Sequence, residues 1–461
     1  MRRLPKTEQQ ADHRRMVGLE DQEHVGAYSV VSNKSTMMSG TKFQKLVLDR
    51  NNLNLAYQRV VSNKGVAGLD GMTVDELLPY LREHRKDILT FLANGNYKPK
   101  PVKRVNIPKQ NGGTRKLGIP TVMDRMVQQA VAQVMSPLFE QVFSESSFGF
   151  RPHRSAQQAI NQVVKLWNQG YHTVVDIDLK AYFDNVNHDL LIKFIEQTVD
   201  DEWLIKLVRK FLTSGVMNNG LFETSDNGTP QGGPLSPLLA NIYLNELDKE
   251  LTERGHKFVR YADDCNIYVK SRRAGERVLE SISNFLDKKL KLTVNQKKTT
   301  VGSPLRLKFL GFSLGAGRGG AYARPAKEPK VRIKQALKRI TKRNRGISLD
   351  KMLHEIRQKM RGWIQYYSVG KLTTFVQRLD EWLRSRIRQY VWKQWKKFKT
   401  KTTNLKQLGL SAKDAYVAAS TRKGYWRTAH SKTLLYTLTN EKLEHLGLIN
   451  LTKTLQSIQS A

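Results

Sequence analysis

Cysteine is almost absent from this sequence of 461 residues, which contains only Cys265. A single cysteine excludes an internal disulfide and any zinc site built from cysteine pairs. Long apolar runs are also absent, since no stretch approaches the roughly 18 to 20 residues that span a bilayer, and the basic N-terminus has no apolar segment typical of a signal peptide. We therefore expect a soluble intracellular protein.

Acidic residues are scarce beside basic ones: 41 Asp and Glu stand against 78 Lys and Arg, for a net charge of +37. Such an excess on a folded chain indicates a polyanionic partner, with nucleic acid first and an anionic membrane surface second. The length suffices for two or three hydrophobic cores.

The N-terminal part divides into two segments. Residues 1–40 show no sustained period, which predicts a leader that is mobile unless a partner holds it. Residues 41–105 combine helical patterns with a stretch punctuated by Gly65, Gly68 and Gly71. These glycines indicate either tight turns or a close approach of the backbone to RNA.

The central part alternates β-rich runs with helical ones. Residues 102–107, 173–179, 258–269 and 308–312 have the alternation or composition of strands. Residues 124–139 and 235–254 have helical periodicity. We predict an α+β domain with an antiparallel sheet over residues 106–320.

Strand patterns end near residue 327. Three successive apolar stripes at helical spacing predict a small bundle over residues 327–395, with lysines such as Lys334 and Lys338 on its outer face. Residues 396–461 are predicted to form a further basic, helical module.

Two acidic segments of the central domain point to metal chemistry. Asp263 and Asp264 lie between two strand-like runs, at the tip of a predicted hairpin, and Asp176 and Asp178 share one face of a predicted strand. Carboxylates from both segments, brought together, would hold two Mg²⁺ ions for nucleotidyl transfer. Taken alone, however, an Asp-Asp dipeptide is commonly a solvated turn.

A series of motifs accompanies these carboxylates. In chain order they are Ile107-Pro-Lys109, Arg115-Lys-Leu-Gly-Ile-Pro120, Ser147-Phe-Gly-Phe-Arg151, Asp178-Leu-Lys-Ala-Tyr-Phe183, Thr229-Pro-Gln231-Gly-Gly-Pro, Tyr261-Ala-Asp-Asp264, Asn295-Gln-Lys-Lys298 and Phe309-Leu-Gly311-Phe. The series resembles the successive blocks of reverse transcriptases, above all those of the bacterial group II intron reverse transcriptase and maturase family.

The resemblance implies a right-hand polymerase. Residues 41–105 would extend the fingers, residues 106–320 would form fingers and palm, residues 327–395 the thumb and maturase domain, and residues 396–461 a DNA-binding module. Many relatives carry a His-Asn-His endonuclease with paired cysteines, so the sequence is most similar to the short class without it.

The resemblance also assigns roles to single residues. Asp178, Asp263 and Asp264 match the family's catalytic, metal-binding triad, and Asp178 is preferred to Asp176 because Phe183 follows it by five residues. Phe183 would act as a steric gate against ribose, although plain packing is the alternative. The other expected nucleotide-binding residues are Lys109, Arg115, Gln231 and Lys298. The expected RNA-binding or DNA-binding residues are Gly68, Arg151, Gly311, Lys334, Lys338, Arg388, Lys396 and Lys397.

The function implied by the resemblance is that of an RNA-dependent DNA polymerase and intron maturase in the bacterial cytoplasm. It would bind group II intron RNA, promote splicing, and copy the intron into DNA at a target DNA primer with deoxynucleoside triphosphates and two Mg²⁺ ions. Two alternatives stay open: a domesticated reverse transcriptase, for example in phage defence, and an RNA-binding splicing cofactor whose polymerase has decayed. The sequence does not decide between a monomer and a homodimer.

Overall fold

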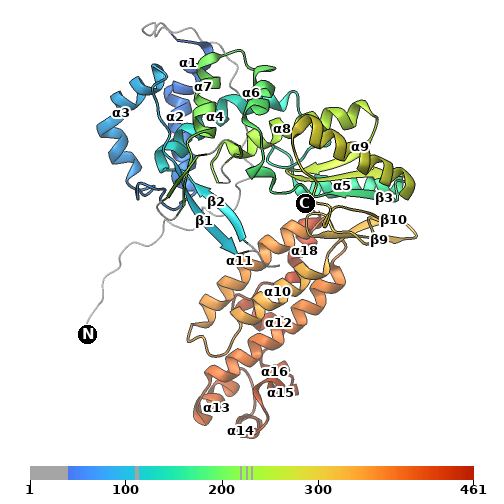
Figure 1. The fold of residues 1–461 in the computed structure, drawn as a ribbon. Helices are drawn as coiled ribbons and strands as arrows, with labels where there is room; N and C mark the ends of the chain where they lie inside the picture. The colour runs from blue at the N-terminus through green and yellow to red at the C-terminus, as the bar shows by residue number, and fades with distance from the viewer. Residues whose placement is uncertain (1–39, 109–113, 219–220, 225–226, 230–231, 461) are drawn as a thin grey trace. The chain divides into compact units, whose positions relative to one another are not determined.

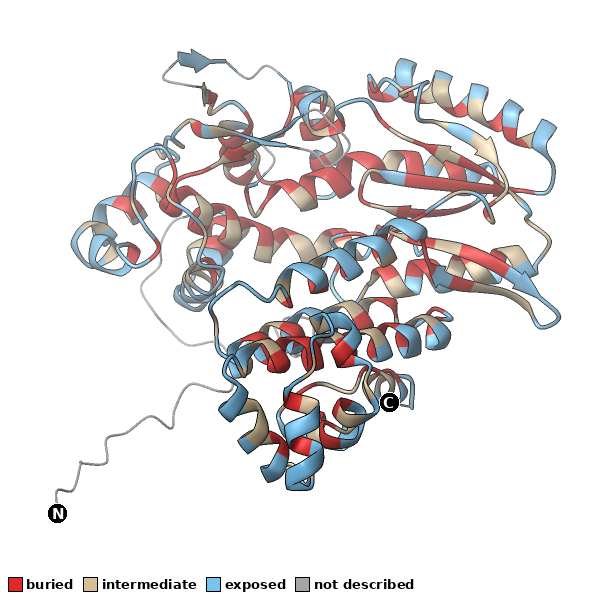
Figure 2. Cartoon of the chain, turned by 90° about the horizontal axis from the view of Figure 1, so that it is seen from below, coloured by how far each residue is buried: buried red, intermediate tan, exposed pale blue. Residues whose placement is uncertain are grey.

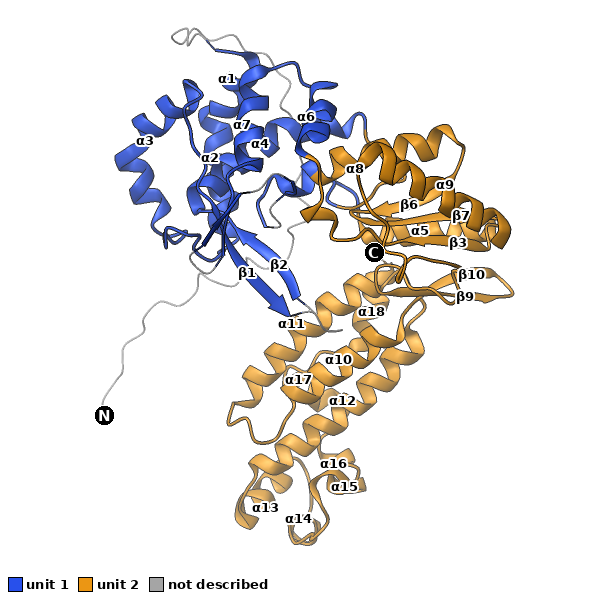
Figure 3. Cartoon of the chain, viewed as in Figure 1, with its two compact units in different colours: residues 1–142, 150–154, 188–239 blue, residues 143–149, 155–187, 240–461 orange. Residues whose placement is uncertain are grey.

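The computed structural model describes residues 40–460 except 109–113, 219–220, 225–226 and 230–231 (Figure 1). The expected leader up to residue 39, Lys109 and Gln231 lie outside the described residues. The chain divides into two compact units (Figure 3). Unit 1 comprises residues 1–142, 150–154 and 188–239, and unit 2 comprises residues 143–149, 155–187 and 240–461.

Unit 1 surrounds a small mixed sheet with helices. The sheet has the strand order β2-β1-β4-β5, in which β1 pairs antiparallel with β2 and parallel with β4. Thr121 begins α4 by accepting a hydrogen bond from the Asp124 backbone N–H, the usual N-cap contact. The elements are α1 (Lys42–Leu48), α2 (Arg50–Ser62), α3 (Leu77–Ala93), β1 (Val102–Pro108), β2 (Thr114–Ile119), α4 (Val122–Glu140), α6 (His188–Glu196), α7 (Glu202–Leu212), β4 (Val216–Asn218) and β5 (Leu221–Glu223).

Unit 2 contains the predicted antiparallel sheet. Its strand order is β6-β7-β3-β8, every pair is antiparallel, and the hairpin expected over residues 258–269 is formed by β6 and β7. Helix α5 packs on β6, and α9 packs on β3, β7 and β8. The elements are α5 (Ala156–Asn168), β3 (Thr173–Ile177), the 3-10 helix η1 (Tyr182–Asp184), β6 (Lys257–Tyr261), β7 (Asp264–Val269), α9 (Arg272–Leu290), β8 (Thr300–Gly302), β9 (Phe312–Gly317) and β10 (Gly320–Pro325). Helix α8 (Ser236–Glu253) begins in unit 1 and continues into unit 2.

The three helices predicted after residue 327 are present in unit 2 as α10 (Lys327–Ile340), α11 (Leu349–Tyr367) and α12 (Thr373–Gln394). Their apolar stripes are buried, and Figure 2 shows that helices of the chain carry both buried and exposed residues. Shorter helices follow: α13 (Phe398–Gln407), α14 (Ala412–Ala419), α15 (Tyr425–Ala429), α16 (Lys432–Thr437), α17 (Asn440–His445) and α18 (Leu451–Ser460). The last helix, α18, returns to pack on α11 and α12. In the part of the chain that the structure describes, no helix is long and apolar enough to cross a membrane.

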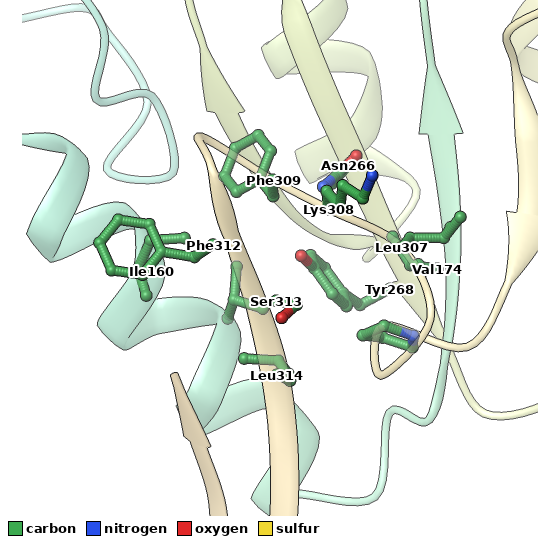
Figure 4. Close-up of a pocket in the computed structure, with 12 residues that line it drawn as sticks. Ile160, Val174, Asn266, Tyr268, Leu307, Lys308, Phe309, Phe312, Ser313 and Leu314 are labelled. Atoms are coloured by element: carbon green, nitrogen blue, oxygen red, sulfur yellow. The ribbon is translucent and has the colours of Figure 1, made fainter. Parts of the chain in front are cut away.

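The strand expected over residues 308–312 is wrong. Leu310 and Gly311 have positive φ angles of 51° and 77°, and the backbones of Phe309 and Phe312 bond to each other across them. A strand cannot continue through two left-handed residues, so β9 begins only at Phe312. The turn closes over a small, mostly apolar pocket lined by residues such as Tyr268, Phe309 and Phe312 (Figure 4).

Candidate active site

The Asp263–Asp264 pair lies where β6 turns into β7. Tyr261 pairs with Asp264, so only Ala262 and Asp263 form the loop. Ala262 has a φ of 56°, the left-handed conformation that tight hairpin loops require at their first position. Asp263 is half-buried and Asp264 is exposed at the first position of β7.

Strand β3 brings Asp178 to the same end of the sheet. The ladder between β3 and β7 pairs Asp176 with Asn266 and Ile177 with Cys265. Continued by one residue, this register sets Asp178 across from Asp264, just beyond the last pair. The predicted alternation is present, since Val175 and Ile177 are fully buried while the two aspartates are half-buried. The three acids of the expected triad therefore lie at the same end of the unit 2 sheet.

Residues that follow α9 form hydrogen bonds and an ion pair with Asp178. The Asn295 side-chain amide donates to Asp178 Oδ1 at 3.0 Å, and the Lys298 ammonium lies 3.2 Å from Oδ2. The Asn295 backbone N–H also donates to the Asp178 carbonyl at 2.8 Å. Lys298, expected at the nucleotide, thus forms an ion pair with the triad.

Desolvation and the crowding of negative charge raise the pKa of two carboxyl groups at this end of the sheet. Desolvation, followed by the charges of Asp263, Asp176 and Asp178, raises the pKa of Asp264 to about 6. Desolvation and then Asp178 raise the pKa of Asp176 to about 6 as well. Because the Asp264 side chain is exposed, solvent partly screens this repulsion. A cation placed among these carboxylates would relieve the repulsion.

The carboxylates are not arranged as a finished metal site. Among the residues that the structure describes, no three His, Cys, Asp or Glu side chains are grouped to hold one ion. Asp178 is instead turned towards Lys298 and Asn295. Any ion bound by all three acids would require Asp178 to exchange these contacts.

Phe183 stands near the triad on η1, five residues after Asp178. Its ring contacts the ring of Tyr182 edge-on, with centroids 5.1 Å apart, and it stays half-exposed. Tyr182 is fixed by a hydrogen bond from its hydroxyl to the Ala240 carbonyl at 2.8 Å. Packing therefore orients the Phe183 ring while leaving part of it accessible.

The remaining predicted residues fall into two groups. Arg115 is exposed on β2 of unit 1, and Lys334, Lys338, Lys396 and Lys397 are exposed in unit 2. Gly68 and Gly311 have internal packing reasons: a Cβ on Gly68 would lie 2.7 Å from the Thr121 Cα, and one on Gly311 would lie 2.7 Å from the Tyr367 hydroxyl. The glycine at 68 thus permits close approach of two protein segments.

Two residues that were expected to contact nucleic acid, Arg151 and Arg388, have buried side chains. Arg151 is 7% exposed and forms an ion pair with Glu140 at 3.0 Å. Arg388 is 5% exposed and donates to the Leu438 carbonyl at 2.9 Å and to the Asn440 side chain at 3.1 Å. Since both guanidinium groups are engaged inside the protein, we no longer expect them to contact RNA or DNA directly.

A buried ion pair behind the carboxylate turn was not predicted from the sequence. Arg260 on β6 and Asp248 on α8 pair at 2.5 Å, and both side chains are 0% exposed. A charged residue inside the otherwise apolar run Phe258-Val-Arg260 was the available signal, because such a residue needs a buried partner.

Two family models match the chain. The family described as reverse transcriptase (RNA-dependent DNA polymerase) matches residues 107–314, and the group II intron, maturase-specific domain matches residues 330–409. The first match contains Asp178, Asp263 and Asp264, and the second covers the three-helix bundle from residue 330 of α10 to the end of α12.

Several curated proteins are similar in sequence to this chain. Group II intron-encoded protein LtrA of Lactococcus lactis is 32% identical over 356 residues, which cover 63% of this chain and 59% of that protein. Protein YkfC of Escherichia coli is 35% identical over 281 residues, covering 52% of this chain and 74% of that protein. The putative COX1/OXI3 intron 1 protein of Saccharomyces cerevisiae is 29% identical over 347 residues, covering 59% and 41%. The chain thus spans about three fifths of the length of the Lactococcus protein.

Proposed function

The chain belongs to the family of group II intron-encoded reverse transcriptases, and on that premise we propose that it is an RNA-dependent DNA polymerase and intron maturase. The observation that carries the polymerase proposal is that Asp178, Asp263 and Asp264 lie at the same end of the unit 2 sheet. The maturase proposal rests on the match of residues 330–409 to the maturase-specific domain.

We propose Asp178, Asp263 and Asp264 as the residues that hold the divalent ions of this family, and Mg²⁺, two ions, as their identity. Carboxylate oxygens are the ligands that Mg²⁺ prefers, and the mutual repulsion of these acids favours a cation among them. Bound ions of this kind lower the pKa of an attacking hydroxyl and neutralise charge on phosphate.

The chain's own residues would position the reactants. Lys298, released from Asp178, would place its ammonium against the phosphates of the incoming nucleotide, where a flexible point charge is suitable. Arg115, Lys109 and Gln231 are the further proposed nucleotide contacts. The accessible part of the Phe183 ring would exclude a ribose 2′-hydroxyl.

The basic surface would bind the nucleic acids. We propose group II intron RNA, the target DNA and its primer as partners, and deoxynucleoside triphosphates as substrates. The net charge of +37 supports this choice, and so do exposed lysines of α10 such as Lys334 and Lys338. The corresponding location is the bacterial cytoplasm.

Primer extension tests the polymerase proposal. Purified protein with an RNA template, a DNA primer, the four deoxynucleotides and Mg²⁺ should extend the primer to the end of the template. Extension should stop when EDTA removes the ion. A protein that binds this primer–template but never extends it would contradict the polymerase and favour the splicing cofactor.

Splicing tests the maturase proposal separately. The RNA that copurifies with the protein should be a single group II intron, and the protein should accelerate splicing of that intron at low Mg²⁺ concentration. Copurification of no particular RNA, together with normal primer extension, would favour a domesticated polymerase.

A further inference from the structure

Arg260 is a fully buried charge next to the carboxylate turn. It lies on β6, two residues before Ala262, and is 0% exposed. A buried guanidinium is costly unless every part of it is paired. Asp248 of α8 satisfies one side, because its two carboxylate oxygens accept from Arg260 Nε at 2.7 Å and from Nη2 at 2.5 Å.

The other side of the guanidinium is directed at the turn itself. Arg260 Nη1 donates to the Ala262 carbonyl at 2.9 Å and to the Asn241 side-chain oxygen at 3.0 Å. The Ala262 carbonyl belongs to the peptide that leads directly into Asp263. A charged donor makes a stronger hydrogen bond than a neutral one, so this contact fixes the peptide firmly.

A second segment braces the same turn from behind. The Asn241 amide donates to the Gly149 carbonyl at 2.8 Å, which ties α8 to residues 146–149. Those residues pair with β6, since Phe148 N donates to the Arg260 carbonyl at 2.9 Å and Arg260 N donates to the Ser146 carbonyl at 2.8 Å. Gly149 touches the turn so closely that a Cβ there would lie 2.3 Å from the Ala262 nitrogen.

We propose that Arg260 is a positioning residue for polymerisation, which sets the place of Asp263 and Asp264 through the Ala262 carbonyl, and that Asn241 and Gly149 complete this support. The proposal rests on the proposed function, since it assigns the support a consequence for catalysis. It explains why a buried ion pair, a side-chain amide and a glycine converge on one two-residue loop.

Three variants perturb the support in different ways. Arg260→Lys keeps the charge beside Asp248, but an ammonium lacks the fork that reaches Asp248, Asn241 and Ala262 together. Asn241→Ala removes the link to Gly149 and leaves the ion pair intact. Gly149→Ala adds a methyl group that would clash with the backbone of Ala262 in the turn. Asp380→Asn is the matched control, because it breaks the ion pair of Asp380 with Arg384, in which Asp380 is 1% exposed, within α12.

Each protein is measured below its own unfolding midpoint. Primer extension gives kcat and the KM for deoxynucleotides, paramagnetic resonance gives the Kd for Mn²⁺ in the absence of nucleotide, and thermal melting gives stability. We expect Arg260→Lys and Gly149→Ala to lower kcat on the order of 100-fold with little change in KM, since misplacement by about 1 Å has that effect. We also expect weaker Mn²⁺ binding by about tenfold, and a smaller change in the same direction for Asn241→Ala.

Asp380→Asn should melt at a lower temperature and keep the wild-type kcat and Mn²⁺ Kd. If the three support variants also melt lower but keep both values, Arg260 has only a structural role and the proposal is wrong. If Arg260→Lys does not fold, Asn241→Ala and Gly149→Ala decide the question. A wild type without polymerase activity would refute the proposed function alone, because the Mn²⁺ comparison would still report on the position of the carboxylates.

Discussion

Asp264 is exposed to solvent, yet desolvation and the neighbouring aspartates favour its protonated form. Its ordinary pKa of 3.8 is raised to about 6 by desolvation and by Asp263, Asp176 and Asp178. Between about pH 4 and pH 6, in the absence of metal, Asp264 therefore binds more protons in the folded protein than in the unfolded chain. The contribution of Asp264 to the free energy of unfolding should consequently fall as pH rises through this window.

Asp264→Asn should remove much of that dependence. In EDTA near pH 7 we expect the variant to be more stable than the wild type by about 1 kcal/mol, a small value because solvent screens the exposed side chain. Near pH 4 the two proteins should be equally stable. Urea unfolding at both pH values measures this, with Asp287→Asn, an exposed acid of α9, as the control. Equal pH dependence in wild type and Asp264→Asn would contradict the charge crowding described for this edge.

Substitution of Phe183 distinguishes the two roles that the sequence left open, a steric gate against ribose and plain packing. If its exposed ring edge excludes ribose, Phe183→Ala should raise incorporation of ribonucleotides relative to deoxynucleotides on the order of 10- to 100-fold, the scale of a steric discrimination. Phe183→Tyr keeps an aromatic ring and should keep the selectivity. Single-nucleotide incorporation with each substrate gives both ratios. A Phe183→Ala protein that is slower with both nucleotides by the same factor would indicate packing alone.

Among the elements, the hairpin of β6 and β7 was predicted best, because alternating side chains on both sides of a short polar turn leave few other folds. The three helices α10 to α12 were also predicted, since each carries a long apolar stripe. The strand expected at residues 308–312 was wrong because nothing in the residue types showed that Leu310 takes a left-handed conformation.

Side-chain environments were harder to predict than elements. Arg388 lies in a basic run, but residues 438–440, fifty positions later, cover it. The partners of Arg260 are equally remote, since Asp248 and Asn241 lie on α8 and Gly149 lies before α5. Sequence periodicity tells which face of an element is buried, and it does not tell which distant segment buries it. Arg388, whose expected role was corrected, and Arg260, which was missed, are both contacted by such distant segments.

Helix α10 presents its lysines to solvent, with Lys334 placed over the Trp382 ring at 5.4 Å and Lys338 one turn further along. If these lysines contact phosphates, each substitution by alanine should weaken RNA binding and reduce the slope of log K against log salt by about 0.7 to 0.9. Binding measured at four salt concentrations gives the slopes. Lys289→Ala on α9 is the control and should leave the slope unchanged. Weaker binding with an unchanged slope would mean that Lys334 and Lys338 act through packing.

At the scale of the whole molecule, a large excess of Lys and Arg coexists with a group of aspartates at one end of the unit 2 sheet. The net charge of +37 would favour binding of a polyanion such as the proposed nucleic acids, whereas Asp178, Asp263 and Asp264 concentrate negative charge at one end of the unit 2 sheet. The proposed polyanion binding and the proposed phosphoryl chemistry would thus have separate physical origins in this chain. Loss of the acids should therefore abolish synthesis without weakening the hold on RNA.

Comparison of Asp263→Ala with Asp287→Ala in primer extension on an RNA template tests the central claim most directly. Asp263 lies in the carboxylate turn, and Asp287 is an exposed acid on α9 of the same unit. We predict that Asp263→Ala binds the primer–template as the wild type does and adds no deoxynucleotide above background, while Asp287→Ala extends the primer at the wild-type rate. Full extension by Asp263→Ala would show that the polymerase centre lies elsewhere.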